Sequence, residues 1–212
     1  TFIDSDHHQI EISERTFLQA IETVIYNIES YDTTTVRASI GNYLVSKYIR
    51  ENSDCKVIFN GDGSDEVCGG YIYMKNAPSA LDFQDECERL VAEIYKFDVL
   101  RSDRSISSNG LEARTPFLDK EFVSYYLSIN PKEKIFNDST RIEKHLLRMA
   151  FSKMDILPKS ILWRRKCAFS DGVSSQEKSW HLVLKNFINE QISNLEFESE
   201  SLKISHCRPE LK

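Results

Sequence analysis

Glycines and acids are interleaved in one short stretch, Val57–Tyr71, which reads VIFNGDGSDEVCGGY. The stretch holds four of the chain's seven glycines and three carboxylates: Gly61, Gly63, Gly69, Gly70, Asp62, Asp65 and Glu66. A buried strand that ends in a glycine-rich turn and opens a helix brings backbone close to a ligand, because ligands of open α/β sheets bind beyond the carboxyl ends of the strands. We expect Gly61 and Gly63 to allow positive φ angles and this close approach.

The acids of this loop would repel a phosphate unless a cation lies between them. Mg²⁺ binds one or two carboxylates together with phosphate oxygens, so the pattern predicts a loop for a nucleotide with Mg²⁺. The GxxxxGK[ST] pattern of a P-loop is absent. A solvated turn is the alternative, since Asp-Gly is a common turn dipeptide.

Arg37 is the second candidate, because we expect it in the first turn of a helix, where the helix dipole disfavours a cation. Its neighbours Thr34 and Thr35 would add hydroxyls, so the group favours a bound anion. The alternative is a surface arginine paired with Asp32 or Glu29.

Two charged segments follow. Residues 162–175 read LWRRKCAFSDGVSS and place Lys166 before a loop with Gly172. A lysine there could follow moving phosphate charge, although a solvated basic face is the alternative. Residues 99–119 carry three arginines and three acids around Gly110 and Pro116, which favours a packing role with paired charges, with substrate contact as the alternative.

The elements that must position these groups follow from apolar spacing. It predicts strands over residues 7–12 and 55–59, paired in parallel, and helices over 14–31, 32–52, 85–100, 120–129, 141–151 and 179–192. Asp32 and the threonines after it are the expected N-cap of the second helix. No further clear strand follows Tyr71. The fold class is therefore α/β: the remnant of a parallel Rossmann-like sheet with flanking helices, followed by a mostly helical region.

Bulk properties narrow the function. The 212 residues are 41% hydrophobic and 28% charged, with a net charge of −6, which argues against nucleic acid as the main partner. The sequence contains no run of 18 apolar residues, so we expect no membrane-spanning helix. The five scattered cysteines show no zinc or disulfide spacing, so we expect a cytoplasmic location.

Taken together, five collinear segments resemble the synthetase domain of the glutamine-hydrolysing asparagine synthetase family, which has a PP-loop ATP pyrophosphatase fold. The matching segments are YDTTTVRAS (31–39), NGDGSDEVCGGYIY (60–73), GLEARTPFLD (110–119), EKHLLR (143–148) and WRRKCAFSDGV (163–173). The resemblance implies that ATP adenylates the β-carboxylate of aspartate and releases pyrophosphate. Ammonia, made from glutamine by an N-terminal domain, then attacks β-aspartyl-AMP to give asparagine and AMP.

The resemblance also implies cofactors and roles. ATP and Mg²⁺ are the expected cofactors, and a homodimer is one assembly left open. Asp65 matches the Mg²⁺ ligand, Asp62 the carboxylate linked to adenylate formation, and Lys166 the lysine that steadies pyrophosphate. Arg37 matches a further catalytic position. The family's ATP-binding positions are matched by Asn60, Gly61, Gly63 and Ser64. Its positions near aspartate and pyrophosphate are matched by Thr34 and Thr35.

The chain departs from the family pattern in three respects. Asp62 stands where the family's GEGSDE loop has Glu, which shortens the side chain by about 1.5 Å of reach. The SGGLDS pyrophosphate loop and the glutaminase domain are absent, and we expect them upstream of Thr1. We therefore expect a fragment that by itself neither hydrolyses glutamine nor holds ATP well.

The expected parts are residues 1–75, the α/β nucleotide-binding part without that pyrophosphate loop; 76–192, the helical part of the same domain; and 193–212, a polar tail. Two other functions stay open. One is a related ATP-dependent amide or lactam synthetase. The other is a non-catalytic paralogue that acts as a binding or scaffold module, which the Asp62 departure favours.

Overall fold

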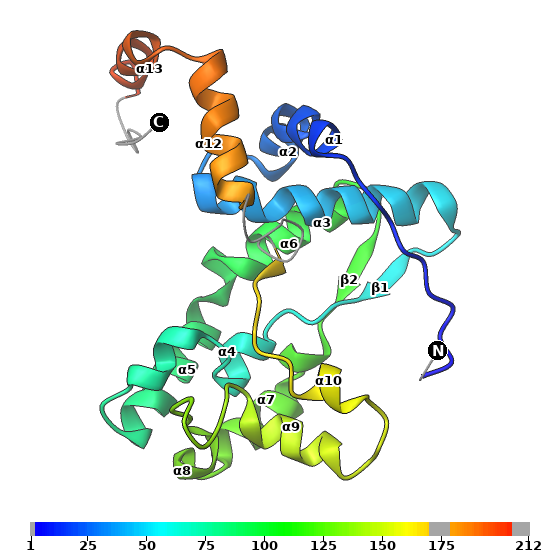
Figure 1. Ribbon diagram of the computed structural model, residues 1–212, viewed down its shortest axis with the longest axis vertical. Helices are drawn as coiled ribbons and strands as arrows, with labels where there is room; N and C mark the ends of the chain where they lie inside the picture. The colour runs from blue at the N-terminus through cyan, green and yellow to red at the C-terminus, as the bar shows by residue number, and fades with distance from the viewer. Residues whose placement is uncertain (1–2, 170–178, 205–212) are drawn as a thin grey trace.

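Helices dominate the computed structural model, which describes residues 3–169 and 179–204 (Figure 1). The first three helices are α1 (Glu14–Gln19), α2 (Ile21–Ile28) and α3 (Thr33–Asn52). Those that follow the first strand are α4 (Ser64–Cys68), α5 (Ala80–Glu93), α6 (Asp98–Ser107), α7 (Lys120–Ser128), α8 (Pro131–Lys134), α9 (His145–Ser152), α10 (Lys159–Leu162), α12 (Trp180–Gln191) and α13 (Asn194–Ser201). Short 3₁₀ helices are η1 (Ile72–Asn76), η2 (Ile94–Lys96) and η3 (Pro116–Leu118). No helix within the described ranges combines the length and apolar character needed to cross a membrane.

The sheet of the described chain has two parallel strands. Strand β1 (Val57–Phe59) pairs with β2 (Glu112–Arg114), and Val57 lies opposite Glu112. The predicted α/β class with a remnant parallel sheet is confirmed, but two details of the prediction are wrong. Residues 7–12 form no strand, because their apolar–polar alternation finds no partner. The true partner of β1 comes after Tyr71, where no strand was expected.

Several predicted helices have different bounds in the structure. The predicted helix 14–31 is divided at Ala20 into α1 and α2. The predicted helix 85–100 begins earlier, at Ala80, and is followed by η2 and α6 rather than continuing. By contrast, the Asp32 cap is confirmed, because its side chain accepts a hydrogen bond from the Thr35 amide. A capping carboxylate stabilises a helix start by about 1 kcal/mol.

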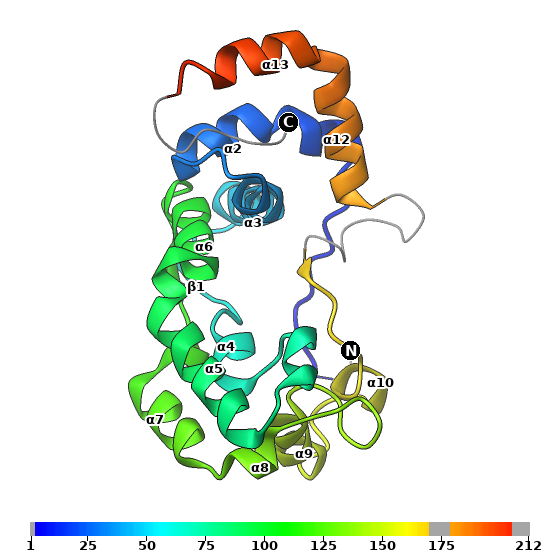
Figure 2. The ribbon, with the colours of Figure 1, turned by 90° about the vertical axis from the view of Figure 1, so that its left-hand side faces the viewer.

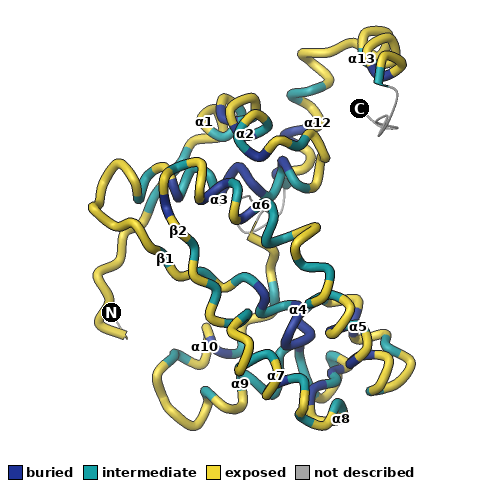
Figure 3. The backbone as a smooth tube through the Cα atoms, turned by 180° about the vertical axis from the view of Figure 1, so that it is seen from behind, coloured by how far each residue is buried: buried dark blue, intermediate teal, exposed yellow. Residues whose placement is uncertain are grey.

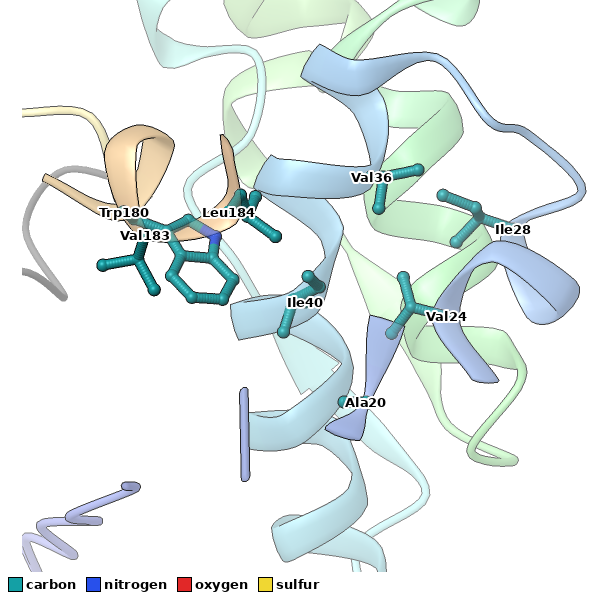
Figure 4. Close-up of a cluster of buried hydrophobic side chains, with 8 residues drawn as sticks. All are labelled: Ala20, Val24, Ile28, Val36, Ile40, Trp180, Val183 and Leu184. Atoms are coloured by element: carbon teal, nitrogen blue, oxygen red, sulfur yellow. The ribbon is translucent and has the colours of Figure 1, made fainter. Parts of the chain in front are cut away.

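Buried residues gather in two regions, one around α2, α3 and α12 and the other around α4 and α5 (Figure 3). Figure 2 shows α5 and α6 running along one side of the molecule, from α3 towards α7 and α8. In the first region α3 lies between α2 and α12 (Figure 4). Its core residues are Ala20, Val24, Ile28, Val36, Ile40, Trp180, Val183 and Leu184. This core fixes the N-terminal half of α3, which carries Thr34, Thr35 and Arg37.

Replacing Ile40 with alanine should therefore destabilise the protein strongly. Ile40 is fully buried between the two neighbouring helices, so the change leaves a cavity and costs about 2–5 kcal/mol of unfolding free energy. Urea unfolding measures this loss. Leu195→Ala is the matched control, since Leu195 is 80% exposed on α13 and should change stability by less than about 0.5 kcal/mol. Equal losses for the two variants would contradict the assignment of this core.

Candidate functional site

The loop between β1 and α4 has the predicted strand–turn–helix form. Asn60 closes the loop, because its side-chain amide donates to Asp62 Oδ2 at 2.8 Å while its Oδ1 accepts from the Asp62 amide at 3.1 Å. Gly63 has a φ of 85°, and a Cβ there would lie 2.3 Å from Leu118 Cδ2. The expectation of a positive φ is thus confirmed for Gly63 and wrong for Gly61. Gly61 is exposed, and a Cβ on it would meet no atom within 4 Å, so its surroundings are open to a ligand.

Asp65, in the first turn of α4, lies between two lysines. Its Oδ2 accepts a hydrogen bond from Lys166 Nζ at 2.6 Å, although the two residues are 101 positions apart. On the other side, Lys144 Nζ forms a salt bridge with Asp65 Oδ1 at 2.8 Å. Lys144 Nζ also donates a hydrogen bond to Ser64 Oγ at 2.9 Å. A Cβ on Gly70 would lie 1.9 Å from Asp65 Oδ1, so only glycine leaves room for this carboxylate.

The charges of this cluster are partly shielded from solvent. The side chain of Asp65 is 24% exposed, that of Lys166 20% and that of Lys144 18%. Burial by itself raises the pKa of Asp65, but the two lysines outweigh burial and hold that pKa below its ordinary value. The carboxylate is therefore ionised at neutral pH. It holds two ammonium groups in one place, which is an arrangement suited to an anion with several negative charges.

Lys166 is also fixed through its backbone. Its amide donates to Glu143 Oε1 at 2.8 Å, and Arg148 Nη2 donates to the same oxygen at 2.7 Å. Arg148 further donates to the carbonyl oxygen of Leu162. Glu143 is only 3% exposed, so this is a buried pair with its hydrogen bonds satisfied. The pair ties the chain on both sides of the Arg164–Lys166 segment to α9.

Tyr71 lies between Lys166 and a second group of charged residues, Glu66, Asp98 and Arg101. The Tyr71 hydroxyl is 2.5 Å from both Glu66 Oε1 and Asp98 Oδ2, and Asp98 pairs with Arg101. Burial, and then the neighbouring Glu66, raise the pKa of Tyr71 far above its ordinary value, so the hydroxyl stays protonated. Sequence reasoning assigned no role to this tyrosine.

Arg101 on α6 connects the start of α3 with the loop electrostatically. The positive charge of Arg101 attracts the carboxylates of Asp62, in the loop, and Asp32, at the start of α3. The pKa of Asp32 is lowered mainly by hydrogen bonds from Thr35, and Arg101 contributes to the same lowering. The chain that follows Lys166 packs on α3, because a Cβ on Gly41 would lie 2.5 Å from Phe169 Cε1.

Two statements about Arg37 need correction. It lies in the second turn of α3, one turn later than expected. Neither Asp32 nor Glu29 pairs with it, and in the part of the chain that the structure describes its guanidinium has no ion-pair partner. The Thr35 hydroxyl donates to Asp32 Oδ1 at 2.7 Å, whereas Thr34 is exposed. The predicted loop with Gly172 falls within residues 170–178, which lie outside the described residues.

The charged segment 99–119 has the predicted packing role. Arg104 on α6 donates to the Ile28 carbonyl oxygen and so joins α6 to α2. Arg114 and Glu112 pair on β2, the strand next to the loop.

The cluster around Asp65 does not fit a metal ion as it is arranged. Both carboxylate oxygens lie within 3 Å of an ammonium group. In the described ranges, no group of three or more His, Cys, Asp or Glu side chains could hold a metal, whereas Mg²⁺ bound with a nucleotide needs only one or two carboxylates. A Mg²⁺ at Asp65 would have to displace at least one lysine. The role of Asp65 as a Mg²⁺ ligand therefore stays a prediction.

Lys144 is the site residue that sequence reasoning missed. It lies in one of the segments that carry the family resemblance, but the expected helix 141–151 gave no reason to single it out. In the structure α9 begins only at His145, and Lys144 has a left-handed φ of 56°. This backbone conformation is rare for a lysine and accompanies the turn of its side chain towards Asp65.

Comparison with known proteins identifies the family of the chain. The family model described as asparagine synthase matches residues 1–86 and 75–206. Proteins named asparagine synthetase [glutamine-hydrolyzing] are similar over the whole chain: the rat protein is 48% identical over 211 residues, the chicken protein 50% over 210 and the human protein 47% over 210. The alignments cover 99–100% of this chain but 37% of each relative.

Proposed function

This chain belongs to the asparagine synthase family, and from that premise we propose that it is part of an ATP-dependent ligase that makes asparagine. ATP would adenylate the β-carboxylate of aspartate and release pyrophosphate. Ammonia derived from glutamine would then attack β-aspartyl-AMP to give asparagine and AMP. The chain spans 37% of the length of the relatives. In this proposal glutamine hydrolysis is assigned to another part of the protein.

The convergence of Asp65, Lys144 and Lys166 beside the glycine loop supports this proposal most strongly. Adenylation builds negative charge on the α-phosphate and on the leaving pyrophosphate, and fixed cations in a partly shielded site stabilise such charge. Asp65 holds the two lysines until a phosphate competes for them. The helical part, residues 76–192, supplies both lysines, while the nucleotide-binding part, residues 1–75, supplies the loop.

The other predicted residues take roles that fit their positions. Asn60, Gly61, Gly63 and Ser64 form the surface against which ATP binds. Thr34 and Thr35 lie at the start of a 20-residue helix, where amides and the helix dipole favour an anion. Arg37 adds a cation one turn later, towards aspartate or pyrophosphate. Asp62 contributes to adenylate formation from the loop. ATP with Mg²⁺, a cytoplasmic location and assembly as a homodimer complete the proposal.

The test uses the extended polypeptide, that is, this chain within a protein of the length of the relatives. We expect pyrophosphate release from ATP that requires aspartate, continues over many turnovers only when ammonia is present, and is accompanied by asparagine. Omitting aspartate is the control. Release that follows another carboxylic acid instead would favour a related amide or lactam synthetase. No release from a folded protein would favour a scaffold, in agreement with the shorter Asp62.

A further inference from the structure

The Lys166 side chain is long and flexible, yet its ammonium group is held from two directions. Asp65 Oδ2 accepts its hydrogen bond, and the Lys166 Nζ lies 5.1 Å from the centroid of the Tyr71 ring. A cation within about 6 Å of an aromatic centroid is attracted by the ring face. Lys144 contacts the same carboxylate, but in the described chain no aromatic ring lies under it. The ring therefore distinguishes the two lysines.

The Tyr71 ring is itself held firmly. Its hydroxyl contacts Glu66 and Asp98, and Asp98 is in turn paired with Arg101. Glu66 is only 4% exposed, so its carboxylate has little freedom to move. The Tyr73 ring stacks beside Tyr71, with centroids 5.9 Å apart and an interplanar angle of 19°. The stacked ring is a surface against which a mobile ammonium group can settle.

The Tyr71 ring and the Asp65 carboxylate both hold Lys166, but they differ in their effect on the binding of a phosphate to this lysine. Asp65 neutralises Lys166 and competes with any phosphate for it, whereas the ring is uncharged and does neither. Once a phosphate takes the place of Asp65, the ring still holds the ammonium group in position. We propose that Tyr71 is a positioning residue that keeps Lys166 directed at the phosphate site. The catalytic part of this inference rests on the proposed function.

The position of Lys166 can be tested without ATP or aspartate, by its rate of acylation with dilute acetic anhydride in the extended polypeptide. Peptide mass spectrometry reports each lysine separately. Tyr71→Leu removes the ring and should raise the labelling of Lys166 roughly 3- to 30-fold. Lys144 is the internal control and should change less than about twofold. Tyr71→Phe keeps the ring and should leave Lys166 close to its original rate.

An unchanged Lys166 in Tyr71→Leu, or an equal rise at Lys144, would overturn the inference. If Tyr71→Leu does not fold, as judged by circular dichroism, Tyr71→Phe decides. A Lys166 that becomes strongly exposed in that variant, although the ring is present, shows that the hydroxyl network and not the ring holds it.

Aspartate-dependent pyrophosphate release supplies the catalytic readout. Tyr71→Leu should lower kcat roughly 3- to 30-fold with little change in the KM for aspartate, and Tyr71→Phe should recover most of the loss. A loss confined to KM would contradict a role through Lys166. If the unaltered protein releases no pyrophosphate, the proposed function is wrong. The labelling experiment still tests whether the Tyr71 ring positions Lys166, because it needs neither ATP nor aspartate.

Discussion

Replacing Lys166 with alanine is expected to lower aspartate-dependent pyrophosphate release by a factor of about 10²–10³, because one fixed donor to developing negative charge is lost. The fold should persist. Asp65 keeps its contact with Lys144, and the backbone amide that Glu143 accepts from is still present in the variant. The rate of pyrophosphate release, measured in the extended polypeptide together with a thermal unfolding curve, separates these two effects.

Arg165→Ala is the matched control for this experiment. Arg165 is the preceding residue and is exposed, and it makes no ion pair among the residues that the structure describes. Its removal changes the net charge by the same amount without touching Asp65. Equal losses of rate in the two variants would show that general basic charge matters here, and the assignment of Lys166 to the phosphate site would be wrong.

Asp65→Asn should have the second large effect, because it leaves two ammonium groups facing each other without the carboxylate between them. We expect adenylation to be lost, as both lysines move apart. Stability should also fall, by about 1–2 kcal/mol at neutral pH, since the cluster is partly shielded but not fully buried. Asp54→Asn, at an exposed aspartate, is the control for stability.

The stability loss in Asp65→Asn should depend on pH in a definite direction. The pKa of Asp65 is lowered in the folded state, below the ordinary value of 3.8. Its contribution is therefore present in full above that pH and is lost as the pH falls through the lowered value. Urea unfolding at pH 7 and at pH 3 should show a gap between wild type and variant that narrows at pH 3. A gap of constant size would mean that Asp65 is not held by the lysines.

The loop could be predicted from the sequence because its signals are local. An apolar run, closely spaced glycines and a following helical segment specify strand, turn and helix without knowledge of the rest of the chain. The capping role of Asp32 is local for the same reason. The sheet was harder. Strand β2 is only Glu-Ala-Arg, too short and too charged to show strand periodicity, and its existence depends on pairing with β1, more than fifty residues earlier.

The site itself could be predicted only through the family resemblance. Spacing along the chain does not show that Lys166 meets Asp65, since a separation of 101 residues carries no geometric information. Lys144 shows what this approach misses. Its segment has helical periodicity, whereas its place in the site depends on a left-handed residue just before the helix. Tyr71 was overlooked because a tyrosine beside a glycine turn is ordinary until a lysine is seen over its ring.

In the proposed function, Asp65, Lys144 and Lys166 mark the place where ATP is cleaved to an acyl-adenylate and pyrophosphate. Exchange of radiolabelled pyrophosphate into ATP measures this half-reaction directly and needs no ammonia. In the extended polypeptide we expect exchange that depends on aspartate, persists in Arg165→Ala and disappears in Lys166→Ala. Aspartate-dependent exchange at the original rate in Lys166→Ala would contradict this proposal.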